Sequence, residues 1–372
     1  MRIALIGRRF DPGGGGTERD LVITAEILAR AGHDISIYAN DVRAHAPKWS
    51  VQRVSGPSIG RALGLWWFAQ RAGTVARREG AQIVLSFARI VAADVLRSGG
   101  AAHSSYVRAA RRWRGAAAAS AMRLSPYHRV QVAIERRGFA SDYLKNAIAV
   151  SDLVRRDLIE TFALEPSKVL TLYNGVDLER FRPPTDRAIR AQVRRELEIP
   201  EAAPITVFVG NGFARKGLRF LIEAWPALGS NAHLVVAGAD RAAASYRRLA
   251  RRLGVTDRVH FLGPHGRIEQ IFAAADGLAL PSLFEPFGNV IMEAMASGLP
   301  ALCSRACGAA ETLPQAFREF VVNDPADIGE LIRGMKALLS VRGDLATVAR
   351  ATAEQFTWER YGRELLDLLE RL

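Results

Sequence analysis

The chain has 372 residues, of which 49% are hydrophobic, which is enough for two hydrophobic cores, so two domains are expected. No apolar run approaches the roughly 20 residues of a membrane-spanning helix, and no signal-peptide pattern is found, so a cytoplasmic protein is expected. The formal net charge of +13 calls for a negatively charged partner, although only five of the 51 basic residues are lysines, a bias that a GC-rich genome also produces.

The first half opens as a doubly wound α/β domain. An apolar strand over residues 2–7 is followed by a glycine-rich loop, a helix that runs to about Arg30 and a strand over residues 35–38. The four consecutive glycines at 13–16 allow backbone N–H groups to approach a ligand closely. Their spacing is not G-x-G-x-x-G, so no dinucleotide fingerprint is present, and a merely flexible loop stays the alternative.

The rest of this half adds helices over residues 61–79 and 152–162, further strands and a basic segment. Between residues 104 and 138 there are eight arginines and a single acid, Glu135, with aromatic and apolar residues interleaved. Such a segment suits an anionic membrane surface or an acidic substrate; a solvated helical face is the alternative. The further strands are expected over residues 83–87, 147–151 and 169–172.

A second α/β series begins after a linker at residues 181–184. Its strands are expected over residues 205–210, 233–237, 258–262, 277–280 and 300–303, and an amphipathic helix over 358–372 ends the chain. We therefore expect one domain over residues 1–172 with 358–372, and another over 173–357. Ligands bind at the carboxyl ends of the strands in open α/β sheets, so two such domains that face each other form a cleft.

Two loops of the second half carry charges suited to a nucleotide-sugar. Glu285 and Glu293 lie eight positions apart across a strand-to-helix junction, with Gly288 between them. The helix N-terminus suits a phosphate, and carboxylates accept hydrogen bonds from the paired hydroxyls of a ribose or hexose. Glutamates near a helix start also arise from the helix dipole alone.

The cations Arg215 and Lys216 follow the first strand of the second series. A guanidinium and an ammonium in this crossover loop suit a diphosphate, which they stabilise as it leaves with negative charge. A chance basic pair near a helix start is the alternative, but it would oppose the helix dipole.

Together these motifs resemble the retaining GT-B glycosyltransferases of family four. The resemblance extends over nearly the whole chain and includes the Asn174-Gly175-Val176-Asp177 turn, the Arg215-Lys216-Gly217 loop and the pair of glutamates. Within the family, residues 15–20 and 212–217 resemble the lipopolysaccharide core glucosyltransferases that add glucose to heptose. The implied fold is GT-B: two facing, doubly wound Rossmann-like domains, with the C-terminal helix crossing back to the first.

The resemblance also implies roles for the donor site. Glu293 is expected to bind the ribose hydroxyls and Glu285 the hydroxyls of the donor sugar, while Arg215 and Lys216 bind the diphosphate. The diphosphate is also expected to contact the backbone of Phe287, Gly288, Asn289 and Val290.

On the first domain, the resemblance implies that Gly15 and Gly16 face the donor and that Asp20 contacts the transferred sugar. His103 is the candidate for a contact to the acceptor or to a phosphate, with a structural histidine as the alternative, and Asp94 is a weaker candidate. Where relatives carry an acid in the following loop, this chain has glycine and alanine at residues 99–102.

No D-x-D motif occurs, so neither a metal nor another cofactor is expected. Retention without an obvious nucleophile implies a front-face path. The expected reaction is transfer of a hexose, above all glucose from UDP-glucose, to a lipid-anchored saccharide such as inner-core heptose, at the anionic inner face of the cytoplasmic membrane. Alternatives are GDP-mannose or UDP-N-acetylglucosamine as donor in exopolysaccharide or glycolipid synthesis, and a non-catalytic scaffold or basic binding protein. No nucleic-acid-binding motif is present, so nucleic acid is not expected as a partner.

Overall fold

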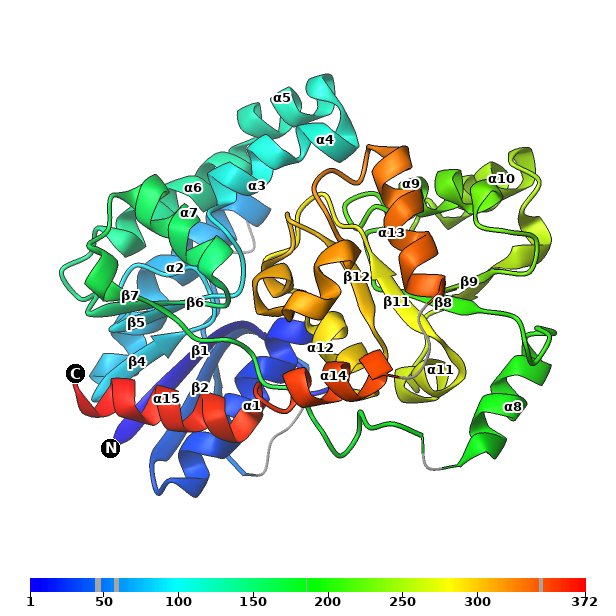
Figure 1. Cartoon of the computed structure of the whole chain (residues 1–372). Coiled ribbons are helices and arrows are strands. Elements are labelled where there is room, and N and C mark those ends of the chain that lie inside the picture. Colours follow the sequence, from blue (N-terminus) through cyan, green and yellow to red (C-terminus); the bar gives the residue numbers. More distant parts are fainter. Residues whose placement is uncertain (44–47, 57–59, 185, 341–343) are drawn as a thin grey trace. The chain divides into compact units, whose positions relative to one another are not determined.

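The computed structural model describes residues 1–43, 48–56, 60–184, 186–340 and 344–372. The chain forms two compact units: unit 1 comprises Met1–Asn174 and Trp358–Leu372, and unit 2 comprises Gly175–Thr357. Each unit contains one parallel sheet flanked by helices (Figure 1). The predicted α/β class, with two Rossmann-like domains, is confirmed.

The sheet of unit 1 has seven strands in the order β3-β2-β1-β4-β5-β6-β7, and all of the paired neighbours are parallel. The order reverses between β1 and β4, which makes the carboxyl ends of these two strands the switch point where doubly wound folds bind ligands. The strands are β1 (Arg2–Phe10), β2 (Asp34–Val42), β3 (Ser50–Arg53), β4 (Ile83–Ser86), β5 (Val95–Ser98), β6 (Asn146–Ala149) and β7 (Val169–Thr171).

The C-terminal helix belongs to the core of unit 1, as predicted. The buried side chains of Tyr361 and Leu365 pack among those of α1 and the sheet, and the hydroxyls of Thr24 and Tyr361 lie 3.2 Å apart. The helices of unit 1 are α1 (Gly16–Arg30), α2 (Arg61–Arg78), α3 (His103–Ala109), α4 (Arg111–Arg114), α5 (Ala116–Leu124), α6 (Pro126–Phe139), α7 (Asp152–Phe162) and α15 (Trp358–Glu370).

The sheet of unit 2 has six strands in the order β10-β9-β8-β11-β12-β13, again parallel, and its order reverses between β8 and β11. The strands are β8 (Ile205–Val209), β9 (His233–Ala237), β10 (Val259–Gly263), β11 (Gly277–Leu280), β12 (Ala301–Ser304) and β13 (Val321–Val322). The helices are α8 (Arg187–Glu196), α9 (Leu218–Ala224), α10 (Ala243–Arg252), α11 (Ile268–Ala274), α12 (Asn289–Ala296), α13 (Ile328–Ser340) and α14 (Asp344–Ala353).

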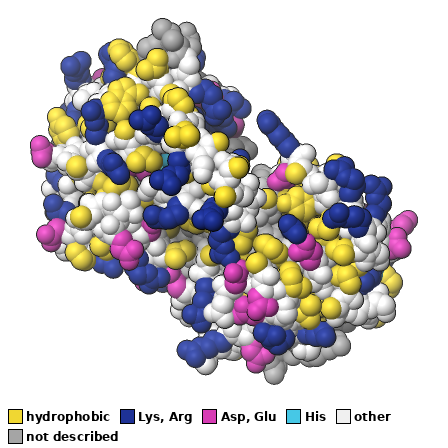
Figure 2. All heavy atoms as spheres, turned by 90° about the horizontal axis from the view of Figure 1, so that it is seen from above, with side chains coloured by type: hydrophobic (Ala, Val, Ile, Leu, Met, Phe, Trp, Pro, Cys, Tyr) yellow, Lys and Arg dark blue, Asp and Glu magenta, His cyan; other side chains and the backbone are white. Residues whose placement is uncertain are grey.

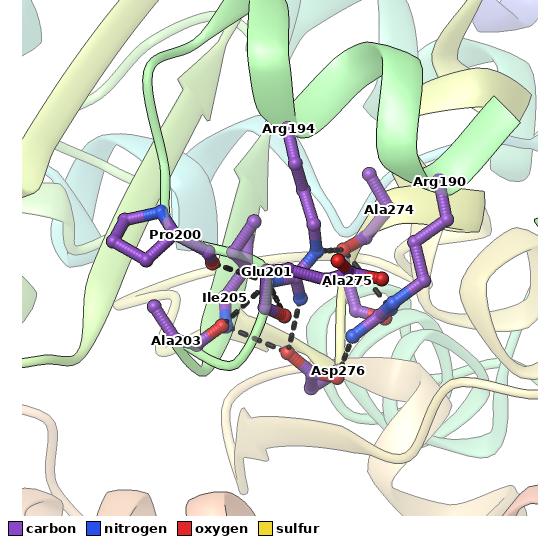
Figure 3. A network of polar contacts seen from close by, with 9 residues as sticks. All are labelled: Arg190, Arg194, Pro200, Glu201, Ala203, Ile205, Ala274, Ala275 and Asp276. Carbon is purple, nitrogen blue, oxygen red and sulfur yellow. Dashed lines mark hydrogen bonds and ion pairs between the residues drawn. The ribbon is translucent and has the colours of Figure 1, made fainter. Parts of the chain in front are cut away.

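Helix α8 is fixed to unit 2 by a network of arginines (Figure 3). The guanidinium of Arg194, with 1% of the residue exposed, donates to the carboxylate of Asp276 at 3.0 Å. Arg190 donates to the other oxygen of Asp276 at 2.7 Å. Arg194 also donates to the backbone oxygens of Ala274, Pro200, Glu201 and Ala203. One buried guanidinium therefore ties α8 to the segments that precede β8 and β11.

In the part of the chain that the structure describes, no helix has both the length and the apolar character needed to cross a bilayer.

Candidate functional site

The charged residues predicted in unit 2 meet at its switch point. The loop after β8 carries Arg215 and Lys216, and the loop after β11 carries Glu285. Because β8 and β11 are neighbouring parallel strands, their carboxyl ends lie at the same edge of the sheet. This topology brings together side chains that are about 70 positions apart in sequence.

The three side chains form one compact cluster. Lys216 Nζ donates to Glu285 Oε2 at 2.7 Å, and Arg215 Nη1 donates to the same oxygen at 3.0 Å and to the Phe284 carbonyl at 2.6 Å. Burial on its own would raise the pKa of Glu285, but the charges of Lys216 and Arg215 outweigh it and hold the pKa below its ordinary value. Glu285 is therefore ionised at neutral pH and orients both cations.

Glycines let the two loops approach each other. Gly217 has φ +81°, and a Cβ on it would lie 1.9 Å from the Pro281 carbonyl oxygen. Gly210 has φ +137°, and a Cβ there would lie 2.5 Å from Lys216 Cε. The side chain of Lys216 thus occupies space that only a glycine at 210 leaves open.

The loop before α12 is held in place by contacts with residues that follow β12. Gly288, with φ +99°, immediately precedes the helix, and a Cβ there would lie 2.9 Å from Cys307 Sγ. Cys307 Sγ donates to the Phe287 carbonyl at 2.9 Å, and the Ala309 N–H donates to the same oxygen at 2.8 Å. The positive end of the α12 dipole therefore starts three residues after Glu285, beside the two cations, and the arrangement suits an anion.

The other predicted donor-site residues belong to α12. Asn289 and Val290 are its first two residues, and Glu293 is partly buried one turn further along the helix. The binding of ribose by Glu293 and of diphosphate by this first turn stays a prediction.

In unit 1, the glycine loop leads directly into α1. Gly15 precedes the helix and Gly16 is its first residue, and both are exposed. Asp20, by contrast, is buried: its Oδ2 accepts hydrogen bonds from Arg97 Nη2 at 2.9 Å and from Asn174 Nδ2 at 3.2 Å. Burial raises the pKa of Asp20, although Arg97 opposes this. The contact of Asp20 with a sugar stays a prediction, since the structure shows it engaged with these two side chains.

His103 is the first residue of α3 and is buried against α6. Its Nε2 shares a hydrogen bond of 2.8 Å with Nδ1 of His128, and its backbone N–H donates to Glu135 Oε2 at 2.7 Å. Burial, the charge of Arg89 and the neighbouring His128 lower the pKa of His103 to about 4. His103 is therefore neutral at pH 7, and its role toward an acceptor stays a prediction.

The expectation for Asp94 was wrong. Asp94 precedes β5, so it lies at the opposite end of that strand from the ligand-binding edge. Its Oδ2 accepts hydrogen bonds from Arg77 Nη2 and from the Val84 N–H, both at 2.8 Å. This carboxylate holds α2 to the sheet.

The basic segment folds into helices α3–α6, which surround a hollow of about 910 Å³. Apolar residues such as Val107 and Val132 share the lining, and Leu124 at the end of α5 is 77% exposed. In Figure 2, Lys and Arg side chains lie among hydrophobic ones and are more widespread than Asp and Glu. The arginines that line the hollow are Arg108, Arg111, Arg123, Arg129, Arg136 and Arg137.

The described residues contain no group of three His, Cys, Asp or Glu side chains placed to hold a metal ion. The cations of the cluster, Arg215 and Lys216, lie in the same unit as the N-terminus of α12, and both features suit an anion.

Arg97 was not predicted from the sequence. Arg97 lies inside β5, so its side chain is carried into the interior of unit 1 with none of it exposed. An arginine inside the otherwise apolar start of the run Val95-Leu96-Arg97-Ser98 is the sequence signal that a buried charge lies there.

Family models match both halves of the chain. The model described as "Glycosyltransferase Family 4" matches residues 14–180, and the one described as "Glycosyl transferases group 1" matches residues 189–356.

Curated relatives agree with these models. The D-inositol 3-phosphate glycosyltransferase of Salinispora tropica is 35% identical over 231 residues, which are 57% of this chain and 48% of that protein. The chain spans about half the length of this and similar relatives that it matches. The lipopolysaccharide glucosyltransferase WaaG of Escherichia coli is 26% identical over 319 residues, which are 84% of this chain and 82% of WaaG.

Solved structures show the same fold. The crystal structure of WaaG, a glycosyltransferase involved in lipopolysaccharide biosynthesis, superimposes with a TM-score of 0.83 at 24% identity, covering 98% of this chain and 99% of WaaG. The structure of HepE from Anabaena in complex with UDP-glucose has a TM-score of 0.74 at 19% identity, with both chains covered completely. The fold is GT-B.

Proposed function

The chain belongs to the glycosyltransferases of family 4 and group 1, and from this premise we propose that it transfers a hexose from a nucleotide-sugar with retention of configuration and without a metal. The observation that carries the proposal is the cluster of Arg215, Lys216 and Glu285 beside the N-terminus of α12. It supplies two cations and a helix dipole where the diphosphate of such a donor is expected.

On this proposal the reaction takes the front-face path that the resemblance to retaining transferases implies. The bond between the anomeric carbon and the phosphate oxygen breaks, and the acceptor oxygen bonds to the same carbon from the same face. The proton of the acceptor hydroxyl passes to the phosphate oxygen that leaves. Arg215 and Lys216 stabilise the negative charge that grows on the leaving diphosphate, while Glu285 and Glu293 position the sugar and the ribose.

Glucose from UDP-glucose is the proposed donor. WaaG is named a glucosyltransferase, and HepE was solved in complex with UDP-glucose, which supports this choice. GDP-mannose or UDP-N-acetylglucosamine, in exopolysaccharide or glycolipid synthesis, is the alternative within the same family, and a non-catalytic basic binding protein is the distant one.

The proposed acceptor is a lipid-anchored saccharide, such as the inner-core heptose of lipopolysaccharide. The name of WaaG supports it, and so does the hollow of arginines and apolar residues between α3 and α6, which suits anionic lipid. On this proposal the protein works at the inner face of the cytoplasmic membrane as a peripheral protein.

Proton NMR of UDP-glucose turnover in the presence of EDTA tests the reaction. We expect slow hydrolysis that releases UDP and, first, α-glucose, because retention conserves the anomeric configuration of the donor. First release of β-glucose refutes retention, and a strict requirement for added metal refutes the metal-free site. If the protein turns over only GDP-mannose or only UDP-N-acetylglucosamine, that nucleotide-sugar is the donor and the proposal of UDP-glucose is wrong.

Vesicle flotation tests the membrane part of the proposal. Arg111, Arg112 and Arg114 are exposed residues of α4. Replacing the three by serine is expected to reduce binding to phosphatidylglycerol vesicles, with little binding of either protein to phosphatidylcholine. Unchanged binding of the triple variant to anionic vesicles removes the docking role of this segment.

A further inference from the structure

The loop that carries the two cations of unit 2 begins with an Asn-Gly pair. Asn211 and Gly212 follow β8, and both residues are exposed to solvent. Asparagine deamidates most readily when a glycine follows it, because no side chain then shields the backbone nitrogen that attacks the asparagine. The sequence contains one other such pair, Asn174-Gly175, so the same dipeptide occurs in two environments.

Gly212 offers an unhindered backbone nitrogen. Its φ is +75°, and a Cβ on it would have no atom within 4 Å. Its N–H donates to no acceptor among the residues that the structure describes. Neither crowding nor a hydrogen bond therefore keeps this nitrogen from the side chain of the residue before it.

The side chain of Asn211 is oriented through its oxygen. Oδ1 accepts a hydrogen bond from the Ala239 N–H at 2.7 Å. This bond polarises the side-chain carbonyl and stabilises the negative charge that grows on Oδ1 when a nucleophile adds to Cγ. Within the described ranges Nδ2 has no hydrogen-bond partner, and water reaches the exposed side chain, so the amine is free to leave.

Asn174 is held at both ends of its amide. Only 5% of the residue is exposed, its Oδ1 accepts from Arg97 Nη2 at 2.5 Å, and its Nδ2 donates to Asp20 Oδ2 at 3.2 Å. These contacts must break before the side chain reacts, which requires a local opening of the fold. Asn174 is therefore an internal control for Asn211.

We propose that Asn211 is a site of spontaneous covalent modification, at which the chain deamidates and thereby weakens its own anion site. The Gly212 nitrogen bonds to Asn211 Cγ, the bond from Cγ to Nδ2 breaks, and ammonia leaves with the proton of the Gly212 amide. Water then opens the cyclic succinimide. Cleavage of the bond between the nitrogen and Cγ gives aspartate, and cleavage of the bond between the nitrogen and the backbone carbonyl carbon gives iso-aspartate.

Both products disturb the loop that carries the cations. Asp240 already lies against this loop, since its Oδ2 accepts from the Phe213 N–H at 2.7 Å, so it repels a new carboxylate at position 211. Iso-aspartate also lengthens the backbone by one carbon atom. The neighbouring Gly210 lies against Lys216, because a Cβ on it would be 2.5 Å from Lys216 Cε, so a shift of the backbone moves this ammonium. The loss of nucleotide affinity rests on the proposed function; the deamidation does not.

Peptide mapping by mass spectrometry tests the modification. The full chain is incubated at pH 8 and 37 °C in water labelled with a heavy oxygen isotope, which enters the product when the succinimide opens. Asn211 is expected to convert at least about tenfold faster than Asn174, because the reaction of Asn174 needs a local opening of the fold. In urea that unfolds the chain, the two asparagines are expected to react at similar rates.

The contrary results are equally clear. Equal rates in the folded chain, or no conversion of Asn211, overturn the inference. The same difference between the two asparagines in urea assigns it to the neighbouring sequence and overturns the role of the fold.

Titration with UDP tests the consequence. Asn211→Asp carries the charge of the product and is expected to bind UDP at least about threefold more weakly than wild type. Asn211→Gln, whose longer side chain closes the ring far more slowly, is expected to keep its affinity during the incubation. The affinity of wild type is expected to fall as Asn211 converts. The melting temperature verifies that each variant is folded.

The outcomes separate the inference from the proposed function. Unchanged affinity in Asn211→Asp, or an equal decline in wild type and Asn211→Gln, overturns the effect on the anion site. If Asn211 converts while fresh wild type binds no nucleotide, the proposed transferase function fails and the modification site stands. If fresh wild type binds UDP and Asn211 does not convert, only the inference fails.

Discussion

At the scale of single residues, the central feature of unit 2 is the Glu285 carboxylate, which accepts hydrogen bonds from two cations. Glu285 has 12% of its side chain exposed and accepts from both Arg215 and Lys216 through one oxygen. A partly desolvated carboxylate is costly unless it is paired, and here the pairing also fixes the direction of the cations. The same contacts therefore stabilise the loop and orient the two cations that we propose to bind the diphosphate.

Glu285→Gln keeps the shape of the side chain and removes its charge. The two cations are then left without their partner in a largely buried place, so the free energy of unfolding is expected to fall by about 2–3 kcal/mol at pH 7. The folded state lowers the pKa of Glu285 below 4.5, so this stabilisation is present above that pH and is lost as the pH falls through the folded pKa. Urea denaturation at pH 7 and pH 4 measures it. Glu223→Gln, which breaks the exposed pair with Arg219, is the control, and an equal effect in both variants contradicts the account.

His103 makes a second pH-dependent contribution to the free energy of unfolding. Here the folded state favours the neutral form of the side chain, whereas it favours the charged form of Glu285. Its pKa is about 4 in the folded chain and 6.5 ordinarily, because burial, Arg89 and His128 disfavour its charged form. Between these values the unfolded chain binds more protons, so the contribution of His103 to stability is complete above pH 6.5 and is lost as the pH falls toward 4. His103→Gln is expected to flatten the decrease of unfolding free energy between pH 7 and pH 5. His265→Gln, at an exposed position, serves as the control. If the unfolding free energy falls equally steeply with pH in wild type and in His103→Gln, His103 makes no such contribution.

The sequence alone predicted the charged residues that form motifs in loops. It did not predict the residues whose position depends on burial within the sheet or on the exact ends of a strand. Arg215, Lys216 and Glu285 lie in loops after strands, so their meeting follows from the topology of a parallel sheet. Arg97 was missed because a short strand with an arginine in it does not fit an apolar pattern. Asp94 was misplaced because the boundaries of β5 decide at which end of the strand it lies.

At the scale of elements, the two crossover loops of unit 2 are shaped by glycine. Gly217 and Gly212 both have positive φ, +81° and +75°, but only a side chain on Gly217 meets another atom: its Cβ would lie 1.9 Å from the Pro281 oxygen, whereas the space around Gly212 is open. The contact between the loop and the end of β11 therefore depends on one position.

Gly217→Ala and Gly212→Ala form a matched pair. Both add the strain of an alanine at positive φ, about 1 kcal/mol, and Gly217→Ala adds an overlap that forces the loop from β11, for a total of about 2–4 kcal/mol. Because Lys216 precedes Gly217, we also expect weaker UDP binding in that variant alone. Chemical denaturation measures the loss of unfolding free energy, and titration with UDP measures the loss of affinity. Similar losses in the two variants contradict a special role for the close approach of Gly217 to Pro281.

Helix α8 provides a test of the arginine network in Figure 3. Arg194→Leu leaves Asp276 and several backbone oxygens without their donor, so the unfolding free energy of unit 2 is expected to fall by about 2–4 kcal/mol and α8 to become cleavable by protease. Arg195→Leu changes an exposed neighbour on the same helix and should be close to neutral. If wild type and Arg194→Leu resist limited proteolysis equally, Arg194 does not hold α8 in place.

The strands and helices that sequence predicted are those with a clear apolar period. Helix α7 agrees with the prediction over its full length, whereas β3, β5 and α8 were not predicted. Strand β3 is partly exposed and polar, and β5 has four residues with an arginine among them. The place of α8 depends on a tertiary contact, that of Arg194 with the Ala274 carbonyl and the Asp276 carboxylate about 80 residues away, which no local pattern contains.

At the scale of the whole molecule, two doubly wound sheets, each with one switch point, account for where the candidate sites lie. The repeated order of strand, loop and helix predicted this fold because most of the parallel strands are connected by crossover helices. Unit 2 has its cations at the switch point between β8 and β11, and unit 1 has the glycine loop after β1, at its own switch point between β1 and β4. The residues that complete each site come from distant parts of the sequence, so the topology was needed to assemble them.

The measurement that tests the central claim most directly is calorimetric titration of the full chain with UDP and UDP-glucose in EDTA, compared with GDP and ADP. We predict binding of both uridine nucleotides to wild type and to Lys336→Ala, an exposed lysine of α13, and a loss of at least about tenfold in Lys216→Ala, which removes one cation from the diphosphate. Binding that requires added metal, or that is the same in Lys216→Ala, contradicts the cation site. Binding of none of these nucleotides contradicts the proposed transferase.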